Sequence, residues 1–273
     1  MELKSIKYEK SDGIATIIKN NPPQYGMTLE ILLEMKKTLE DAANDEDVSV
    51  IVITAGGEGF HLGAVVFGEV GNADWKLTPV EFREISQFAR ELFRYIETLE
   101  KPVIGVAKSG AVGGGFENLH ACDFVIASDD AKFSQPEVTL GLCTGWGGSQ
   151  RLTRMVGWRK AKELLLTGIE IDGKEAERIG AITKSVPLDK VDKEVYQLCQ
   201  RLKICAPVAW GYTKLAMNKV WETDHRSGLD FEVEAWGMVN SEREFNAEVF
   251  DDFLNGRQPK FKKRNKITSD WHK

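Results

Sequence analysis

Residues 110–123 read Gly-Ala-Val-Gly-Gly-Gly-Phe-Glu-Asn-Leu-His-Ala-Cys-Asp, and this stretch carries the strongest structural and chemical signal of the chain. Its three consecutive glycines, Gly113–Gly115, let the backbone approach a ligand closely with its amides exposed. The apolar run after them predicts a helix, so these amides lie at a helix N-terminus, where the dipole favours negative charge. Glu117 falls in the first turn, and Glu137 follows in another glycine-rich neighbourhood. Amides that can hold an oxyanion, beside carboxylates that can move protons, indicate chemistry next to a carbonyl group.

The pattern on either side of this stretch alternates between strands and helices. A β-hairpin is expected from two strands at Ser5–Glu9 and Gly13–Ile18, and the apolar runs Val48–Thr54 and Pro102–Ala107 are typical of buried strands. The sequence Thr78-Pro79-Val80-Glu81 predicts a helix start, with a capping threonine, a proline at the first helical position and a glutamate at the third.

This alternation continues to about residue 187, and most of the chain beyond it is expected to be helical. The fold class is therefore α/β, with a core in residues 1–187 and a helical C-terminal region in residues 188–273. Strand–strand–helix units recur in the core, but the pattern alone leaves a doubly wound sheet open.

Composition narrows the class of protein. The chain has 273 residues, 42% of them apolar and 29% charged, enough to bury a sizeable core. Its net charge of −6 argues against a nucleic-acid partner. Four cysteines without Cys-x-x-Cys spacing and scattered histidines predict no metal site, and they favour the reducing cytoplasm. No leader is recognisable, and no apolar run approaches the roughly 18 residues of a membrane span, so no membrane partner is expected.

Several motifs, taken in order, resemble those of the enoyl-CoA hydratase/isomerase family, the crotonases. The likeness covers nearly the whole chain and rests on these stretches: Lys101-Pro102-Val103-Ile104, Gly113-Gly114-Gly115-Phe116-Glu117, Ala121-Cys122-Asp123, Ala131-Lys132-Phe133-Ser134-Gln135-Pro136-Glu137, Gly147-Gly148-Ser149-Gln150-Arg151-Leu152, Thr167-Gly168 and Ala176-Glu177-Arg178-Ile179-Gly180. The resemblance implies a crotonase-like spiral of ββα units with a helical C-terminal trimerisation region. It also implies a homotrimer or dimer of trimers, and an acyl-CoA thioester as the ligand.

The resemblance further implies a role for each candidate residue. The backbone amides of Ala64 and Gly114 would form the oxyanion hole for the thioester oxygen. Glu117 would activate the water that adds to the β-carbon of a 2-enoyl-CoA, Glu137 would donate a proton to the α-carbon, and the amide of Gly145 would help to hold the water. Two carboxylates around one water raise each other's pKa, so one can stay protonated near neutral pH. No cofactor is expected beyond the coenzyme A of the substrate.

The chain also departs from the family pattern near the expected substrate. Val65 stands where an aspartate is usual, the loop Pro22–Met27 differs, and Trp146 stands where a small residue is common. The expected substrate-binding residues are Gly63, Val65, Val66, Phe67 and Trp146. These departures suggest a cyclic or otherwise unusual acyl group, although an indole at position 146 is also compatible with plain core packing.

Hydratase or dehydratase chemistry is the favoured interpretation, because both glutamates are retained. A double-bond isomerase or another crotonase reaction, which needs only one carboxylate, is the nearest alternative. A non-catalytic acyl-CoA binder on the same fold is a third. The structural interpretations remain beside these: the glycines as a tight turn, Glu117 as a complement to the helix dipole, and Glu137 as a surface residue. His61 and His120 have no acidic partner in the pattern and are expected to be structural.

Overall fold

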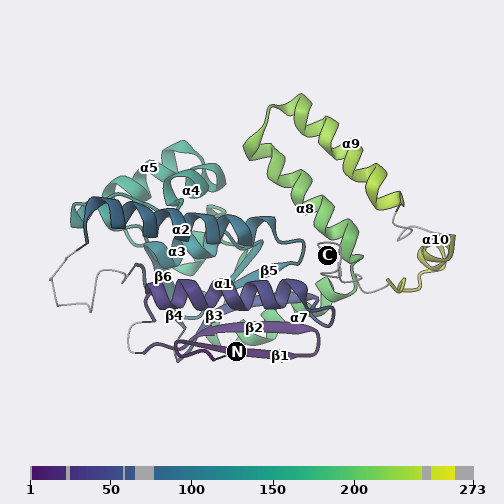
Figure 1. The fold of residues 1–273 in the computed structure, drawn as a ribbon, viewed down its shortest axis with the longest axis horizontal. Helices are drawn as coiled ribbons and strands as arrows, with labels where there is room; N and C mark the ends of the chain where they lie inside the picture. The colour runs from purple at the N-terminus through teal and green to yellow at the C-terminus, as the bar shows by residue number, and fades with distance from the viewer. Residues whose placement is uncertain (1, 23–24, 58, 65–76, 242–246, 262–273) are drawn as a thin grey trace, which may run out of the picture.

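The chain begins with an antiparallel hairpin in the computed structural model, which describes residues 2–22, 25–57, 59–64, 77–241 and 247–261 (Figure 1). Strands β1 (Ile6–Ser11) and β2 (Ile14–Lys19) pair directly, as the sequence predicts. The two turn residues, Asp12 and Gly13, have φ of 51° and 71°. Positive φ at both positions is the geometry that matches a two-residue turn to the twist of its strands, and an Asp-Gly pair favours it.

Two sheets are built from the strands that follow. The larger has six strands in the order β1-β2-β3-β5-β7-β9 and is parallel beyond the first hairpin, whereas the smaller has three parallel strands, β4-β6-β8. The new strands are β3 (Val50–Ala55), β4 (Phe60–His61), β5 (Val103–Ala107), β6 (Gly110–Val112), β7 (Phe124–Ser128), β8 (Lys132–Ser134) and β9 (Lys184–Val186). From β3 to β8, each consecutive pair of strands contributes one member to each sheet. This arrangement is the predicted spiral and excludes a single doubly wound sheet.

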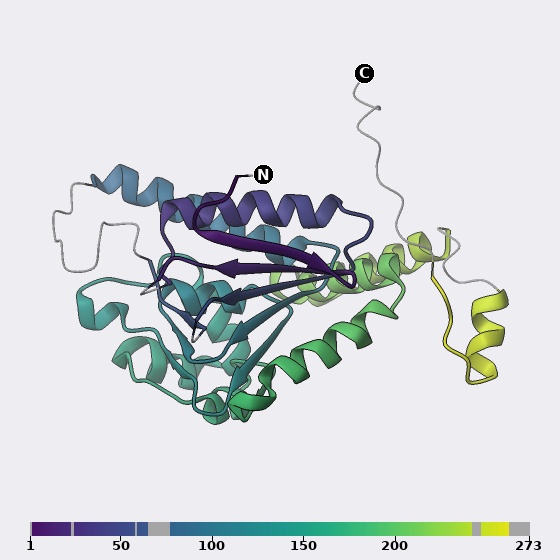
Figure 2. The same ribbon diagram turned by 90° about the horizontal axis from the view of Figure 1, so that it is seen from below.

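Helices cover both faces of the larger sheet (Figures 1 and 2). On β3, Ile51 and Ile53 belong to the main core with α1 (Leu29–Asn44), α2 (Pro79–Thr98) and α3 (Gly114–His120). Val50 and Val52 point the other way, into a second cluster that includes α7 (Val191–Lys203). Burial on both faces explains why this strand is a continuous apolar run.

The predicted helix start at Thr78 is confirmed as a full capping box. The Thr78 hydroxyl accepts a hydrogen bond from the Glu81 amide, and the Glu81 carboxylate accepts one from the Thr78 amide. Likewise, the Thr28 hydroxyl accepts from the amide of Ile31 at the start of α1. Each cap satisfies amides that a helix N-terminus otherwise leaves without a partner.

From β8 onward the described elements are mostly helical. Besides β9 and α7, given above, they are η1 (Glu137–Leu140), α4 (Gly148–Val156), α5 (Trp158–Thr167), α6 (Gly173–Arg178), η2 (Leu188–Lys190), α8 (Pro207–Glu222), α9 (His225–Ser241) and α10 (Ala247–Leu254). Helices α8 and α9 pack as an antiparallel hairpin that projects from the spiral (Figure 1). None of the helices within the described ranges is long and apolar enough to cross a membrane.

The last strand is shorter than the sequence predicts. A strand is expected over Ala181–Val186, but β9 begins only at Lys184. The amides of Ala181 and Ile182 instead donate to the carbonyl of Ala176, which closes the C-terminal end of α6. These two residues therefore cap a helix before the chain joins the sheet.

Candidate active site

The glycine triplet lies where the smaller sheet passes into α3. Gly113 precedes the helix with φ of 52° and ψ of −128°, a conformation that L side chains rarely adopt. A Cβ on Gly113 would lie 3.0 Å from Oε1 of Glu137. Glycine is therefore required at position 113 both by the backbone conformation and by the close approach of the Glu137 carboxylate. The glycine triplet and the segment that carries Glu137 thus lie next to each other.

The two amides predicted to form an oxyanion hole belong to neighbouring residues in space. A Cβ on Gly114 would lie 3.3 Å from the amide nitrogen of Ala64, and a Cβ on Gly63 would lie 3.0 Å from the amide nitrogen of Gly114. Within the described part of the chain, neither the Ala64 nor the Gly114 amide has a hydrogen-bond acceptor. Two adjacent donors without a protein acceptor are available to a ligand oxygen.

The N-terminal loop supports the Ala64 segment. Met27 forms a parallel bridge with Ala64, and its amide donates to the carbonyl of Gly63 at 3.0 Å. The buried ammonium of Lys19 donates in turn to the carbonyl of Tyr25 at 2.9 Å, and burial lowers the pKa of Lys19 to about 7. Backbone pairing thus holds Gly63 and Ala64 in place.

Glu117 is buried and held by the loop before α4. Its Oε1 accepts hydrogen bonds from the amides of Gly148 at 2.7 Å and Trp146 at 2.9 Å. Burial raises the pKa of Glu117 to about 7; the Gly148 amide opposes this rise, and the nearby Glu137 carboxylate adds to it. A carboxyl group poised near neutral pH suits general acid–base work.

Glu137 is half-buried on η1, and burial raises the pKa of its carboxyl group. The buried Gln135 lies between the two glutamates. With its nitrogen facing Glu137, the Gln135 amide donates to Oε1 at 2.9 Å, the orientation that satisfies both groups. A Cβ on Gly148 would lie 3.0 Å from Glu117 Oε1 and 3.1 Å from the Gln135 amide. The structure therefore brings both predicted carboxylates to one place.

Trp146 is almost fully buried, at 3% exposure. Its ring makes an edge contact with Phe93 of α2, with the centroids 5.9 Å apart. A Cβ on Gly114 would lie 2.6 Å from two of its ring carbons. The indole is therefore part of the core and lies against Gly114, one of the two residues predicted to form the oxyanion hole. The interpretation of Trp146 as a substrate-pocket residue stays a prediction.

Gly145 is exposed, and a Cβ on it would lie 3.6 Å from the hydroxyl of Ser86 on α2. The neighbouring amides of Trp146 and Gly148 hold Glu117, and the sequence did not predict this role for them. The pair Gly147-Gly148 before a helix could have indicated a tight turn with exposed amides, because Gly147 adopts φ of 117°. The predicted substrate-binding residues Val65, Val66 and Phe67 lie outside the described residues.

The two histidines near the site are buried, in agreement with the structural role expected for them. Burial lowers the pKa of His120 to about 3, and its ring lies 4.0 Å from that of Phe116, between centroids. His61 is held through Nε2 by the carbonyl of Val106 at 2.7 Å. Within the described ranges, no group of three or more His, Cys, Asp or Glu side chains is arranged to hold a metal ion.

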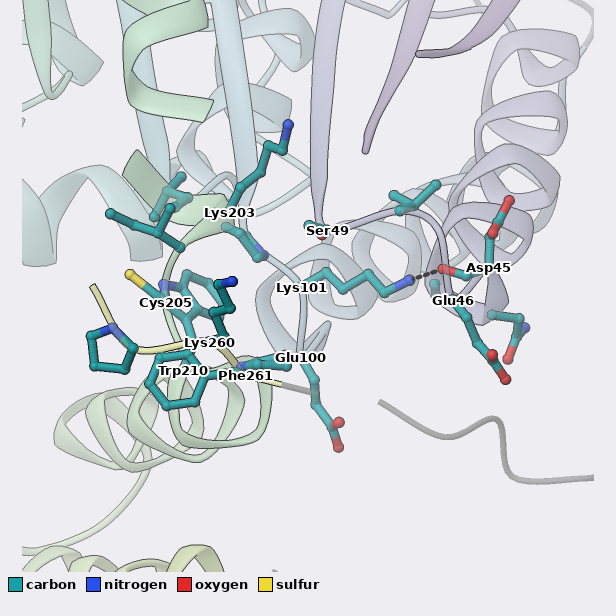
Figure 3. A pocket seen from close by; sticks show the side chains of 18 of the residues that line it. Asp45, Glu46, Ser49, Glu100, Lys101, Lys203, Cys205, Trp210, Lys260 and Phe261 are labelled. Atoms are coloured by element: carbon teal, nitrogen blue, oxygen red, sulfur yellow. Dashed lines mark hydrogen bonds between the residues drawn. The ribbon is translucent and has the colours of Figure 1, made fainter. Parts of the chain in front are cut away.

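A cavity of about 590 Å³ lies elsewhere, where β3 and β5 begin and α7 meets α8 (Figure 3). None of the predicted site residues lines it. Lys101, on its wall, has a structural role, because its ammonium donates to the carbonyls of Ala42 and Asp45 near the end of α1. The cavity is therefore separate from the paired glutamates, which carry the candidate chemistry.

The sequence profile of the enoyl-CoA hydratase/isomerase family matches residues 9–264. The chain is 34% identical to the short-chain-enoyl-CoA hydratase of Clostridium acetobutylicum over 238 residues, covering 87% of this chain and 90% of that protein. It is also 34% identical to the crotonyl-CoA hydratase of Syntrophomonas wolfei over 262 residues, covering 96% and 99%. A solved enoyl-CoA hydratase from Bacillus anthracis superposes with a TM-score of 0.88 at 28% identity, covering 96% and 100%. The chain belongs to the enoyl-CoA hydratase/isomerase family.

Proposed function

We propose that this protein is an enoyl-CoA hydratase, a lyase that adds water to the α,β double bond of an acyl-CoA thioester or removes it. Family membership and the hydratase names of both relatives support the activity. The observation that supports the mechanism best is the proximity of Glu117 and Glu137 beside the amides of Ala64 and Gly114, which have no hydrogen-bond acceptor in the described part of the chain.

In the proposed mechanism, the thioester oxygen accepts hydrogen bonds from the amides of Ala64 and Gly114. Glu117, as a carboxylate, takes a proton from water as its oxygen attacks the β-carbon, and the amide of Gly145 holds that water. Charge develops on the thioester oxygen as an enolate, which the two amides stabilise. Glu137, as a carboxylic acid, then protonates the α-carbon. The proposal involves no cofactor besides the coenzyme A of the substrate.

The test combines isotope incorporation with matched variants. Crotonyl-CoA in ¹⁸O-labelled water should give 3-hydroxybutyryl-CoA that carries the label. Glu117→Gln and Glu137→Gln should each lower kcat by about 10²- to 10⁴-fold, because each loses one proton transfer. A double-bond shift without ¹⁸O uptake would favour the isomerase. Binding without any turnover, across a panel of enoyl-CoA thioesters, would favour the non-catalytic binder.

The substrate class that we propose is a compact acyl group, either short or cyclic. Trp146 fills the space beside Gly114, and the relatives named above are hydratases of short-chain and crotonyl thioesters. The panel should therefore compare crotonyl-CoA, a long straight-chain 2-enoyl-CoA and a cyclic dienoyl-CoA. A clear preference for crotonyl-CoA over the cyclic thioester removes the cyclic hypothesis, and a preference for the long chain removes both.

We further propose that the protein works as a homotrimer or a dimer of trimers in the cytoplasm. The α8–α9 hairpin exposes large apolar side chains in support of this, including Val220 at 77% and Trp236 at 72%. The four free cysteines suit a reducing compartment. Trp236→Glu should shift the mass in light scattering towards the monomer. Trp158→Glu, an exposed tryptophan on α5, is the control and should leave the mass unchanged.

A further inference from the structure

Arg151 is a nearly buried cation that folds back over the N-terminus of its own helix, α4. Its Nη1 donates to the carbonyl of Trp146 at 2.8 Å, and its Nε pairs with Oε1 of Glu97 at 2.5 Å. A Cβ on Gly147 would lie 2.0 Å from this Nη1. The guanidinium thus occupies space that only a glycine leaves open.

Trp146 connects this arginine to the candidate base. Its carbonyl accepts from Arg151, while its amide donates to Glu117 Oε1. The amide of Gly148, two residues further along the chain, donates to the same carboxylate oxygen. A displacement of the Trp146–Gly148 loop would therefore move both donors that orient Glu117.

Glu97 is itself held from the other side, at the end of α2. Its carbonyl accepts from the side-chain amide of Asn218 on α8 at 2.9 Å. Arg94 pairs with Glu97 and also with Glu222, again on α8. Asn218 of α8 thus holds the main chain of Glu97, and Arg94 links its carboxylate to α8 through Glu222. The Glu97 and Arg151 side chains are buried to a similar extent, with exposures of 12% and 9%.

We propose that Arg151, anchored by Glu97, is a positioning residue that fixes the Trp146–Gly148 loop and thereby the carboxylate of Glu117. The planar guanidinium is suited to this task because it can meet a carboxylate and a carbonyl at fixed angles, which an ammonium cannot reproduce. The inference rests on the proposed hydratase role of Glu117 and adds a residue that does not touch the substrate.

Arg151 also contributes to the electrostatics of the site. Among the described residues, the charged groups that act on Glu117 are Glu137 from η1 and Arg151 from α4. The amides of Trp146 and Gly148 and the neutral Gln135 side chain lie beside it. Burial raises the pKa of Glu117, and the positive charge of Arg151 is among the influences that lower it. Loss of that charge should move the acid limb of the rate profile to higher pH, since Glu117 must be deprotonated to act as the base.

The test measures kcat and KM for crotonyl-CoA against pH in Arg151→Met, Arg151→Lys and the wild type. In Arg151→Met, kcat should fall about 10- to 100-fold with KM nearly unchanged, because a small displacement of a catalytic group has an effect of that order. The acid limb should move to higher pH. Arg151→Lys should restore the acid limb, because it keeps the charge, while recovering only part of kcat.

Arg154→Met is the matched control. Arg154 lies on the same helix but is exposed, and its side chain donates hydrogen bonds to Gln150. This variant should leave kcat, KM and the pH profile unchanged. Amide hydrogen exchange gives a readout that does not depend on turnover: the Trp146 and Gly148 amides should exchange faster in both Arg151 variants and not in Arg154→Met.

A purely structural role would lower the melting temperature of Arg151→Met but leave the pH profile and the exchange of these two amides as in the wild type. That result overturns the proposal. If Arg151→Met does not fold, Arg151→Lys provides the test. Unchanged exchange of the two amides and an unchanged kcat in Arg151→Lys would also contradict the proposal. A wild type without hydratase activity would instead refute the proposed function, whereas faster exchange in the Arg151 variants would still stand as evidence for the positioning contact.

Discussion

The buried carboxyl group of Glu117 should destabilise the folded protein at high pH, and Glu117→Gln should remove that effect. Glutamine keeps a side-chain oxygen that can accept from the amides of Trp146 and Gly148, so the loop before α4 retains its anchor. It cannot ionise, however. The variant should therefore be catalytically impaired and, at alkaline pH, more stable than the wild type.

The size of the effect follows from the pKa of Glu117, which burial raises from its ordinary 4.5 to about 7. A raised pKa means that the folded protein binds this proton more tightly than the unfolded chain. The stability that this proton contributes to the folded protein is fully present below pH 4.5, declines as the pH rises, and is lost above about 7. The difference in pKa corresponds to about 3 kcal/mol of free energy of unfolding.

The assay is urea denaturation of the wild type and Glu117→Gln at about pH 5 and about pH 8, at one fixed protein concentration so that any effect of assembly is shared. The stability of the variant relative to the wild type should rise by about 2 to 3 kcal/mol between the two conditions. Glu84→Gln, at an exposed position of α2, is the control and should show no such rise. An equal difference at both pH values would refute the claim that Glu117 is desolvated.

Three other substitutions probe contacts described above. Gly114→Ala should lower kcat about 10²-fold or more, because its Cβ would lie 2.6 Å from the Trp146 ring and would displace the proposed oxyanion donor. Steady-state kinetics measures the loss, and adding Trp146→Ala should relieve it in part. Lys214→Met should destabilise the protein by about 3 to 5 kcal/mol in urea titrations, because Asp123 would be left buried without the ammonium that lies 2.8 Å from it. Thr78→Ala should cost about 1 kcal/mol in the same titrations through loss of the capping box, with kcat unchanged.

Local sequence signals predicted much of the fold. The capping box at Thr78, the first β-hairpin and the buried strand β3 each depend on neighbours within a few residues, and each is confirmed. Strands β4 and β6 were not predicted, because two or three residues are too short to show a period. Their place in the smaller sheet comes only from pairing with distant segments.

The candidate site also has a part that the local sequence predicts and a part that depends on distant segments. The glycine turn at Gly113 and the first-turn position of Glu117 follow from spacing, and both are observed. The hold of the Trp146 and Gly148 amides on Glu117 joins segments about 30 residues apart, with separations of 29 and 31, so no local pattern encodes it. Lys19 shows the converse: its charged side chain favours solvent, yet it shares a face of β2 with Ala15 and Ile17, and tertiary packing buries it completely.

The asymmetric hold on Glu117 has a consequence for the product. Among the described residues, the hydrogen bonds from Trp146 and Gly148 to this carboxylate both end on Oε1, and Oε2 has no hydrogen-bond donor. One oxygen is thus occupied in orienting the group, and only the other is available to receive a proton. A nucleophile that can be deprotonated from one direction reaches a planar alkene from one side, so the hydroxyl-bearing carbon should form as a single enantiomer.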